Sequence, residues 1–283
     1  MDARALIEHA LDAGVVGMSP LTGGCVAEVY RVTTDDGRTL AAKVERGEEP
    51  GLDLEGTMLA ALAPHAPTPR VVACTPRVLA MAFVEHRGGP SPEGERMLAE
   101  IVGALHGVGA DRYGFDTDTR IGPIRLSNGR DADWNRFFVE KRLRPVCVLA
   151  ERRGALPPGF MGLLDRFAGR VDDAMGEPGA PGLIHGDLWS GNALWRDARP
   201  VALIDPSTLW ADPEFELAFI DLMGGVSGAF WDRYGQLRPI RAGFWERRIH
   251  AYQVVPLAVH AALFGGGYGG QAMGALGRAI RGV

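Results

Sequence analysis

Apolar and polar residues follow two different patterns along the chain, and the change falls near residue 85. Between Ser19 and residue 84, apolar residues lie mainly in short runs rich in valine and threonine, which is typical of β-strands. The tripeptide Asp35-Asp36-Gly37 predicts a hairpin turn, because Asp-Gly accepts the positive φ angles of such turns. The strands expected in this part are 26–33, 39–44, 71–73 and 78–84, and the helices are 3–13 and 52–63.

After the glycines at 88 and 89, the strand pattern largely disappears and apolar residues recur at helical spacing. The helices predicted here are 93–107, 133–152, 159–175, 213–223, 243–264 and 271–281. Two short apolar pieces, 182–185 and 201–204, interrupt them, and an aspartate follows each. The two patterns predict an α+β fold of two lobes. Residues 1–87 form an antiparallel sheet lobe with one main helix, and residues 88–283 form a larger, mostly helical lobe.

Composition narrows the possible environments of the protein. The formal net charge of −5 and the pI of 5.8 argue against a nucleic-acid partner, which favours a basic surface. No apolar run approaches the 18–20 residues or so that a membrane-spanning helix needs, so we expect no membrane association. The three cysteines are too sparse for a disulfide framework or a zinc site. A reducing cytoplasm is therefore the expected location.

The segment 185–192, His-Gly-Asp-Leu-Trp-Ser-Gly-Asn, contains the most specific chemical pattern. Asp187 is followed five residues later by Asn192 and eighteen residues later by Asp205. Phosphoryl transfer needs a carboxylate to orient the attacking hydroxyl and oxygen ligands to hold Mg²⁺ on the phosphates. The protein-kinase catalytic loop has the same order of groups. We therefore expect Asp187 to be the catalytic base and Asn192 and Asp205 to bind Mg²⁺, with His185 bracing the loop.

Two segments of the sheet lobe are candidates for contacts with the phosphates of a nucleotide. Lys43 lies in a predicted strand that resembles the V-A-I-K strand of kinases, and such a lysine needs an acidic partner when buried. Glu55 on the next helix is suitable. Other acids close in sequence are Glu48, Glu49 and Asp53. A surface lysine on an edge strand is the alternative interpretation.

The second segment is the loop that contains Gly23, Gly24, Cys25 and Val26, between two strand-like stretches. It would cover the phosphates, although it has neither the G-x-G-x-x-G nor the Walker pattern. A simple hairpin tip is the alternative interpretation.

Several segments together resemble the fructosamine kinases, or ketosamine-3-kinases, which are relatives of aminoglycoside and choline kinases. They are 22–28, 42–44, 83–86, 113–115, 133–138, 185–192, 204–207 and 214–218. The resemblance implies the protein-kinase-like fold, ATP as phosphate donor and Mg²⁺ as cofactor. It also implies phosphorylation of the 3-hydroxyl of a ketosamine, either small or protein-bound, as a deglycation repair activity. Ribulosamine, erythrulosamine and fructosamine are the candidate sugars.

The resemblance also assigns binding residues. It implies that backbone groups of Glu85, His86 and Arg87 contact the adenine edge. Trp189 would offer a flat surface to the sugar, or else brace the loop from a buried position.

Near the C-terminus, His260 is retained where family members have His-Trp-Asn-His-Phe-Gly, but Ala-Ala-Leu follows it here. If this segment lines the acceptor pocket, the pocket is roomier and less polar. Many family members have cysteine at the position of Cys25, and an exposed thiol there would allow a redox-linked homodimer. A small residue that packs the loop is the alternative.

An aminoglycoside- or choline-type phosphotransferase is the alternative function. Aminoglycosides are polycations, so their binding sites present several acids. The residues that could supply them are Asp212, Glu214, Glu216 and Asp221.

Overall fold

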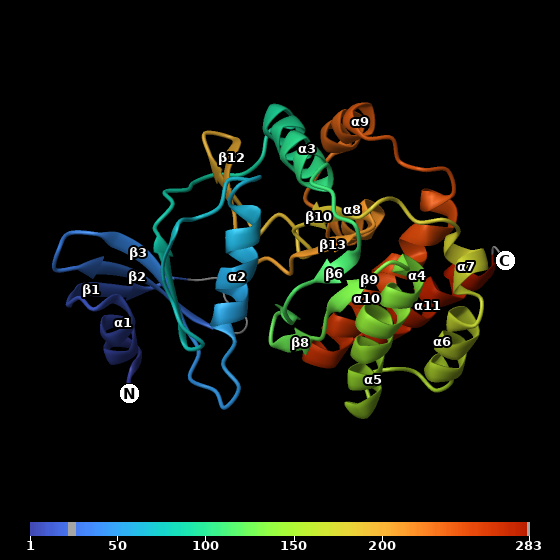
Figure 1. The fold of residues 1–283 in the computed structure, drawn as a ribbon, viewed down its shortest axis with the longest axis horizontal. Helices are drawn as coiled ribbons and strands as arrows, with labels where there is room; N and C mark the ends of the chain where they lie inside the picture. The colour runs from blue at the N-terminus through green and yellow to red at the C-terminus, as the bar shows by residue number, and fades with distance from the viewer. Residues whose placement is uncertain (22–26, 282–283) are drawn as a thin grey trace.

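The computed structural model describes residues 1–21 and 27–281 and shows a sheet region beside a larger helical region (Figure 1). The sheet region contains α1 (Ala3–Leu11), β1 (Val15–Pro20), β2 (Glu28–Thr34), β3 (Thr39–Val44), α2 (Leu52–Leu62), β4 (Val71–Cys74) and β5 (Val78–Ala82). The strands pair antiparallel in the order β1-β2-β3-β5-β4. The predicted antiparallel sheet with one main helix is therefore confirmed.

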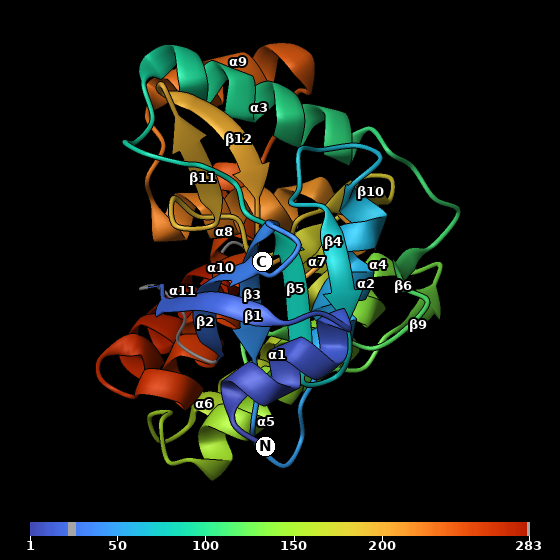
Figure 2. The same ribbon diagram turned by 90° about the vertical axis from the view of Figure 1, so that its left-hand side faces the viewer.

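Helices cover both faces of this sheet, and β5 shows why. Val78 and Ala80 belong to the core that α1 covers, whereas Leu79 and Met81 belong to the core that α2 covers. Since successive strand residues point to opposite faces, an unbroken apolar run fits a strand that is buried on both sides. Figure 2 shows α1 crossing one face, in front of β3 and β5.

The sequence pattern predicted one detail of this sheet, the hairpin turn, and missed another, the first strand. The hairpin predicted at residues 35–37 joins β2 to β3, and Gly37 has a φ of 83°. β1 was not among the predicted strands. Its Gly17, Ser19 and Pro20 interrupt the apolar pattern, and it is an edge strand.

The helical region begins at α3 (Pro92–His106). Its first half continues with β6 (Tyr113–Phe115), β7 (Thr119–Ile121), β8 (Ile124–Leu126), β9 (Gly129–Asp131), α4 (Trp134–Phe137), the π-helix η1 (Phe138–Leu143), α5 (Arg144–Arg152), α6 (Phe160–Ala168) and α7 (Val171–Met175). Its second half contains β10 (Gly182–Ile184), β11 (Ala193–Arg196), β12 (Arg199–Leu203), β13 (Leu209–Ala211), α8 (Pro213–Met223), α9 (Gly228–Leu237), the π-helix η2 (Phe244–Arg248), α10 (Ile249–Phe264) and α11 (Tyr268–Arg281).

The expectation that strands largely disappear after residue 90 is wrong. Strands β10, β13, β6 and β9 form a four-stranded sheet, and β11–β12 and β7–β8 form two ribbons. These strands have three to five residues, too few to show a period of two against a helical background. Helix α9 was not predicted either. The helix predicted at 133–152 is divided into α4, η1 and α5.

An aromatic cluster joins the elements of the helical region. Trp134 packs against Phe137, Phe138, Phe215 and Tyr252, with ring centroids 5.8 to 6.3 Å apart. Its indole nitrogen donates to the hydroxyl of Tyr252 at 2.8 Å, so the buried polar atom has a partner. The cluster ties α4 and η1 to α8 and α10.

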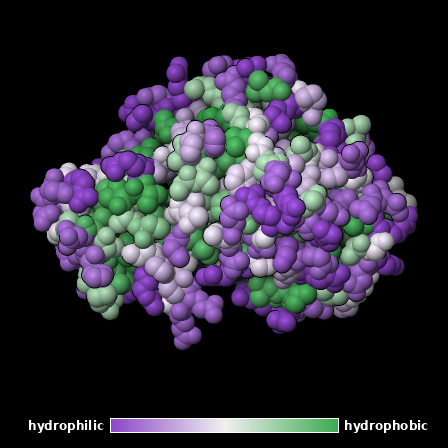
Figure 3. Space-filling view, viewed as in Figure 1, coloured by the Kyte–Doolittle hydropathy of each residue, from purple (hydrophilic) through white to green (hydrophobic). Residues whose placement is uncertain are grey.

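Figure 3 shows hydrophilic residues spread over the face in view, with smaller hydrophobic areas between them. Within residues 1–21 and 27–281, the helices are too short or too polar to cross a membrane. The segment between β5 and α3 links the two regions. The lobe boundary predicted at residue 87 falls within it and stays a prediction.

Candidate active site

A cleft of about 400 Å³ lies between the sheet region and the helical region. Both regions contribute predicted site residues to its wall. These are Lys43, Glu55, Asp187, Trp189, Asn192, Asp205 and His260. Side chains up to 217 positions apart in the sequence thus meet in one cavity.

Lys43 has the acidic partner that was predicted for it. It lies on β3 and is 7% exposed, and its Nζ is 2.6 Å from Glu55 Oε1 and 2.5 Å from Asp205 Oδ1. Burial alone would lower the pKa of Lys43, but the two carboxylates raise it above its ordinary value. The lysine is therefore a permanent cation that links α2 to the loop after β12. The edge-strand alternative is excluded, because β3 lies between β2 and β5.

Asp187 and Asn192 lie at the two ends of the loop between β10 and β11. The Nδ2 of Asn192 donates to the carbonyl oxygen of Asp187 at 2.7 Å and to its Oδ2 at 3.2 Å. With its nitrogen committed in this way, Asn192 has its amide oxygen left for a ligand in the cleft. Burial, together with the negative charge of Asp205, raises the pKa of Asp187 well above its usual range.

Asp205 has a left-handed backbone with φ of 57°, which is uncommon for a residue other than glycine. It follows β12 by two residues, and its side chain is 36% exposed. The short strands β10 and β12 therefore deliver Asp187 and Asp205 to one cleft, as the sequence predicted. Strain of this kind is frequent at functional sites.

His185 braces the catalytic segment, as predicted. The fully buried ring contacts the carbonyl of Ile204 through Nε2 at 3.0 Å, and its Nδ1 accepts from the backbone N–H of Asp187 at 3.3 Å. These partners assign the neutral tautomer with the proton on Nε2. Burial lowers the pKa of His185, in agreement with a neutral ring. The histidine thus joins the loop after β10 to the loop after β12.

Glu216 also contacts the loop after β10, a role that the sequence did not reveal. One carboxylate oxygen accepts from Gly186 N at 2.7 Å, and the other lies 2.8 Å from His106 Nε2. Glycine is required at 186, because φ is 83° and a Cβ would lie 2.1 Å from the carbonyl oxygen of Ser207. The sequence signal that could have indicated this role is the position of Glu216 between Phe215 and Leu217 in an apolar helix.

The structure does not favour the alternative in which Asp212, Glu214, Glu216 and Asp221 present acids to a polycation. The first three are at most 4% exposed. Asp221 is exposed, but it accepts from Gln253 at 2.9 Å and does not line the cleft within the described residues.

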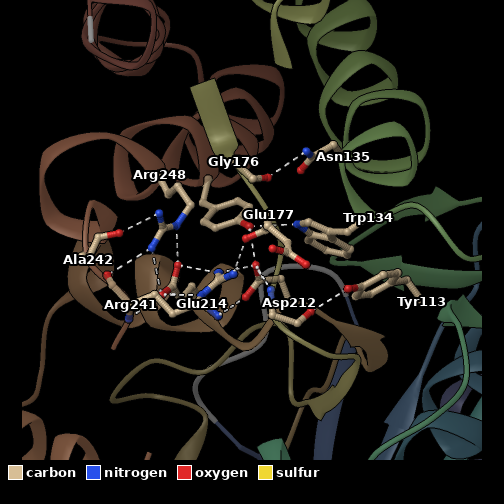
Figure 4. Close-up of polar contacts among 12 residues, drawn as sticks. Tyr113, Trp134, Asn135, Gly176, Glu177, Asp212, Glu214, Arg241, Ala242 and Arg248 are labelled. Carbon is tan, nitrogen blue, oxygen red and sulfur yellow. Dashed lines mark hydrogen bonds and ion pairs between the residues drawn. The ribbon is translucent and has the colours of Figure 1, made fainter. Parts of the chain in front are cut away.

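The residues Asp212, Glu214, Arg241 and Arg248, which we call the acid–arginine cluster, compensate one another (Figure 4). Arg248 Nε lies 2.6 Å from Glu214 Oε2, and Arg241 Nη2 lies 2.5 Å from Asp212 Oδ2 and 2.8 Å from Glu214 Oε2. The Gly179 N–H and the Tyr252 hydroxyl both donate to Asp212 at 3.1 Å. The acids of the cluster therefore have structural partners.

The link between the regions contains the residues predicted to contact adenine, and several of their groups have partners within the chain. The backbone N–H of Arg87 donates to the carbonyl oxygen of Trp195 at 2.7 Å, so this N–H is already used. Glu85 pairs with Arg31, and His86 Nδ1 lies 2.9 Å from the carbonyl oxygen of Val84. Among the described residues, the wall of the cleft does not include 85–87. Adenine contacts by backbone groups of Glu85, His86 and Arg87 stay predictions.

The predicted phosphate loop, Gly23, Gly24, Cys25 and Val26, lies outside the described residues. Ala27, which follows it directly, lines the cleft. The redox-linked dimer through Cys25 is likewise untested.

Trp189, Phe264 and Tyr268 make part of the cleft wall aromatic. Trp189 is 40% exposed there, so the buried bracing position considered for it is wrong. His260 Nδ1 lies 2.8 Å from the carbonyl oxygen of Pro256, and Phe264 and Tyr268 are its ring neighbours.

The altered residues after His260 affect this wall less than expected. Ala261 and Ala262 pack against Ala150 of α5, away from the cleft, and only Leu263 of the three lines it. Of the three replacements, only that at Leu263 can therefore change the wall of the cleft directly.

The arrangement as a whole defines a class of enzyme. A lysine–glutamate pair in a sheet region faces an aspartate–asparagine loop and a second aspartate, which is the site of a phosphotransferase with the protein-kinase-like fold. The chain belongs to the fructosamine kinase family, because the family model described as "Fructosamine kinase" matches residues 2–281. It is therefore an ATP-dependent phosphotransferase that acts on an alcohol group.

Individual relatives agree with this membership. A "Probable ketoamine kinase" of Thermus thermophilus is 34% identical to this chain, and the alignment covers 99% of each of the two chains. The "Ketosamine-3-kinase" of Mus musculus is 27% identical over 89% of this chain and 91% of its own length. A solved fructosamine-3-kinase homologue from Thermobifida fusca has a TM-score of 0.88 and 31% identity, with 99% of both chains covered.

Proposed function

We propose that this chain transfers the γ-phosphoryl group of ATP to the 3-hydroxyl of a ketosamine: a ribulosamine, an erythrulosamine or a fructosamine. The 3-phosphate destabilises the sugar–amine adduct, so the activity would repair glycated amines. The proposal rests chiefly on the convergence of Lys43, Asp187 and Asp205 in one cleft. The names of the mouse ketosamine-3-kinase and of the Thermobifida fructosamine-3-kinase homologue support the 3-position.

The cleft residues fit a Mg²⁺ ion. Glu55, Asp187 and Asp205 share the cleft with Lys43, which leaves an excess of negative charge. Burial and the charge of Asp205 raise the pKa of Asp187. Asp205 and the amide oxygen of Asn192 are hard oxygen donors of the kind that Mg²⁺ prefers. We infer that these two residues would hold the ion. A bound Mg²⁺ would neutralise charge on the phosphates.

The groups of the chain itself have separable roles in this reaction. Asp187 would accept the proton of the attacking hydroxyl, in an orientation that Asn192 and the Gly186–Glu216 contact maintain. Lys43 would donate to the α- and β-phosphates while Glu55 keeps it in place. In this proposal residues 1–87 bind the nucleotide, and residues 88–283 supply the base and the acceptor site.

The part of the cleft wall that Trp189 and His260 contribute suits a sugar attached to an amine. Trp189 offers an exposed face on which the C–H groups of a sugar could pack. His260 donates from Nδ1 to the carbonyl oxygen of Pro256, which leaves the lone pair of Nε2 to accept a hydroxyl proton. Both residues line the same cleft as Asp187. We propose that they orient the acceptor sugar.

An ATP-consumption assay with ribulose-lysine, fructose-lysine and kanamycin tests the proposal, and ³¹P NMR of the product locates the phosphate ester. We expect turnover with the ketosamines and none with kanamycin, because the acids considered for a polycation are buried or lie away from the cleft. Turnover confined to kanamycin, or a phosphate on another hydroxyl, would refute the assignment. The Asp187→Asn variant provides the background rate.

A further inference from the structure

The hairpin of β7 and β8 extends from the helical region to the sheet region, near the lower end of α2 in Figure 1. Arg120, Ile121 and Gly122 of this hairpin line the active-site cleft. None of them was a predicted site residue. The hairpin pairs Arg120 directly with Arg125 on the opposite strand, so the two arginines occupy equivalent positions on one ribbon.

Arg120 forms a buried two-point contact with Glu45 of the sheet region. Its Nη2 donates to Glu45 Oε1 at 2.7 Å and its Nη1 to Glu45 Oε2 at 3.1 Å, with side-chain exposures of 11% and 9%. Its Nε donates to the carbonyl oxygen of Gly122 at 2.7 Å. Paired hydrogen bonds of this kind fix direction as well as distance. The orientation of the guanidinium is therefore set at both ends.

Glu45 connects Arg120 to both residues of the lysine–glutamate pair. It follows Lys43 by two residues in the chain, directly after β3. Its Oε2 also accepts from the backbone N–H of Gly51 at 2.9 Å, and Gly51 is the N-cap of α2, the helix that carries Glu55. A Cβ at Gly51 would lie 3.0 Å from Arg120 Nη1, so the guanidinium packs closely against this helix start.

On its other side the hairpin is fixed to the helical region. Asn128 donates to the carbonyl oxygen of Thr117 and to the hydroxyl of Thr119, both at 2.9 Å. The fully buried Arg142 donates in turn to Asn128 and to the carbonyl oxygen of Ser127. Movement of Arg120 relative to the core of the helical region is therefore restricted. Through its contact with Glu45, Arg120 can fix the position of the sheet region relative to the helical region.

Three ion pairs link residues up to 87 with residues after 87 within the described chain. The contact of Lys43 with Asp205 would be given up when these groups turn to phosphates and Mg²⁺. Arg87 and Asp197 are 81% and 68% exposed, and such pairs contribute little. Among these three, only the Arg120–Glu45 pair is buried and consists of residues to which the proposed mechanism gives no direct contact with the nucleotide.

We propose that Arg120 is a positioning residue, which holds the two regions in their closed arrangement through Glu45 and so sets the affinity for the nucleotide. A site that is competent only when closed loses apparent affinity in proportion to its open fraction. Loss of the pair should thus weaken nucleotide binding more than it slows the bound enzyme. This inference rests on the kinase activity and is independent of which sugar is the acceptor.

The test is a double-mutant cycle of Arg120→Gln and Glu45→Gln, with Mg-ADP affinity measured by calorimetry on the full chain. The Glu45→Gln side chain keeps an oxygen for the Gly51 N–H. We expect each single variant to bind about fivefold to tenfold more weakly, and the double variant to bind no more weakly than the poorer single one. Additive losses, or unchanged affinity in the single variants, would overturn the proposal.

Arg125→Gln is the matched control, because Arg125 is 59% exposed and its nearest acid is 3.8 Å away. It should bind Mg-ADP as the wild type does. Arg120→Lys keeps the charge but not the paired contact, so an intermediate affinity is expected. A lower melting temperature of Arg120→Gln with unchanged Mg-ADP affinity would assign a merely structural role and contradict the proposal. Because Mg-ADP binding needs no acceptor, inactivity toward ketosamines would refute the proposed function without affecting this test.

Discussion

The cleft and the acid–arginine cluster contain the same kinds of residue in opposite states of compensation. In the cleft, the three carboxylates of Glu55, Asp187 and Asp205 share one cation, Lys43, beside the Arg120–Glu45 pair. In the cluster, each carboxylate has at least one arginine of its own within 2.8 Å. The cleft is therefore short of positive charge, and the cluster is not.

The pKa shifts follow this difference. Burial and the charge of Asp205 raise the pKa of Asp187. Burial alone would also raise the pKa of Glu214, but hydrogen bonds from Arg248 and Arg241 lower it. A group of carboxylates that lacks counter-charges can be stabilised by a cation from outside, whereas a paired group can only be disturbed by one. Whether the carboxylates have arginine partners, and not how many carboxylates there are, distinguishes the cleft from the acid–arginine cluster.

The largest expected effect is on the chemical step in the cleft. Asp187→Asn keeps the size of the side chain but removes the proton acceptor. We expect kcat to fall by about 10³-fold or more, or ~4 kcal/mol in activation free energy. Steady-state kinetics with a ketosamine measure the loss, and calorimetry should show that Mg-ADP still binds.

Asp165→Asn is a suitable control for this variant, since Asp165 is 63% exposed on α6 and pairs with Arg144 outside the cleft. Its kcat should equal that of the wild type. Unaltered turnover in Asp187→Asn would remove the base from the mechanism.

The next effect concerns the cluster. Glu214→Ala leaves the buried Arg248 without a carboxylate partner, while Arg241 keeps Asp212, so we expect the free energy of unfolding to fall by about 3 kcal/mol. For a chain of this length the melting temperature should drop by roughly 6–10 °C. Calorimetric melts measure the change, while KM and kcat of the folded enzyme should stay near wild-type values.

Glu140→Ala is the control, because Glu140 is 55% exposed and lies 3.7 Å from its nearest arginine. It should cost less than about 0.5 kcal/mol. An unchanged melting temperature in Glu214→Ala, with a raised KM for a polycationic acceptor, would restore the aminoglycoside alternative.

Local sequence patterns predicted the elements that are long or sharply bounded. The hairpin turn at Asp35-Asp36-Gly37 and the helices that became α2 and α3 have local signals of their own. The three-residue strands β6 and β13 have none, because their partners are other short segments far away in the chain. The strand pattern of β1 is hidden by Gly17 and Pro20 on an edge strand.

The same limit applies to the site. Asp187, Asn192 and Asp205 could be predicted because their order and spacing along the chain are fixed by the chemistry they share. Whether Glu214 faces a substrate or an arginine depends on Arg241 and Arg248, which lie 27 and 34 residues further on. No local pattern contains that pairing. It appears only when residues 241–248, which include η2, pack against α8.

The acceptor end of the cleft should show a smaller effect. Trp189→Ala removes an exposed aromatic surface, so we expect KM for the ketosamine to rise about tenfold, or ~1.4 kcal/mol. The melting temperature and the Mg-ADP affinity should change little. Trp245 is exposed to a similar degree, 45% against 40%, and Trp245→Ala should leave KM unchanged. A lower melting temperature with a normal KM would mean that Trp189 only supports the loop.

Ionic strength gives the smallest effect and compares the two regions in one experiment. Raising the salt from about 0.1 to 0.5 M shortens the Debye length from about 10 Å to roughly 4 Å. The cleft is open to solvent, so its field is screened, and we expect KM for Mg-ATP to rise about twofold to fourfold. The acid–arginine cluster is enclosed apart from Arg241, whose side chain is 31% exposed. The difference in unfolding free energy between wild type and Glu214→Ala should therefore change by less than about 0.5 kcal/mol. The opposite result would be a difference in unfolding free energy that vanishes at high salt while KM for Mg-ATP stays constant. It would mean that salt screens the acid–arginine cluster and not the cleft.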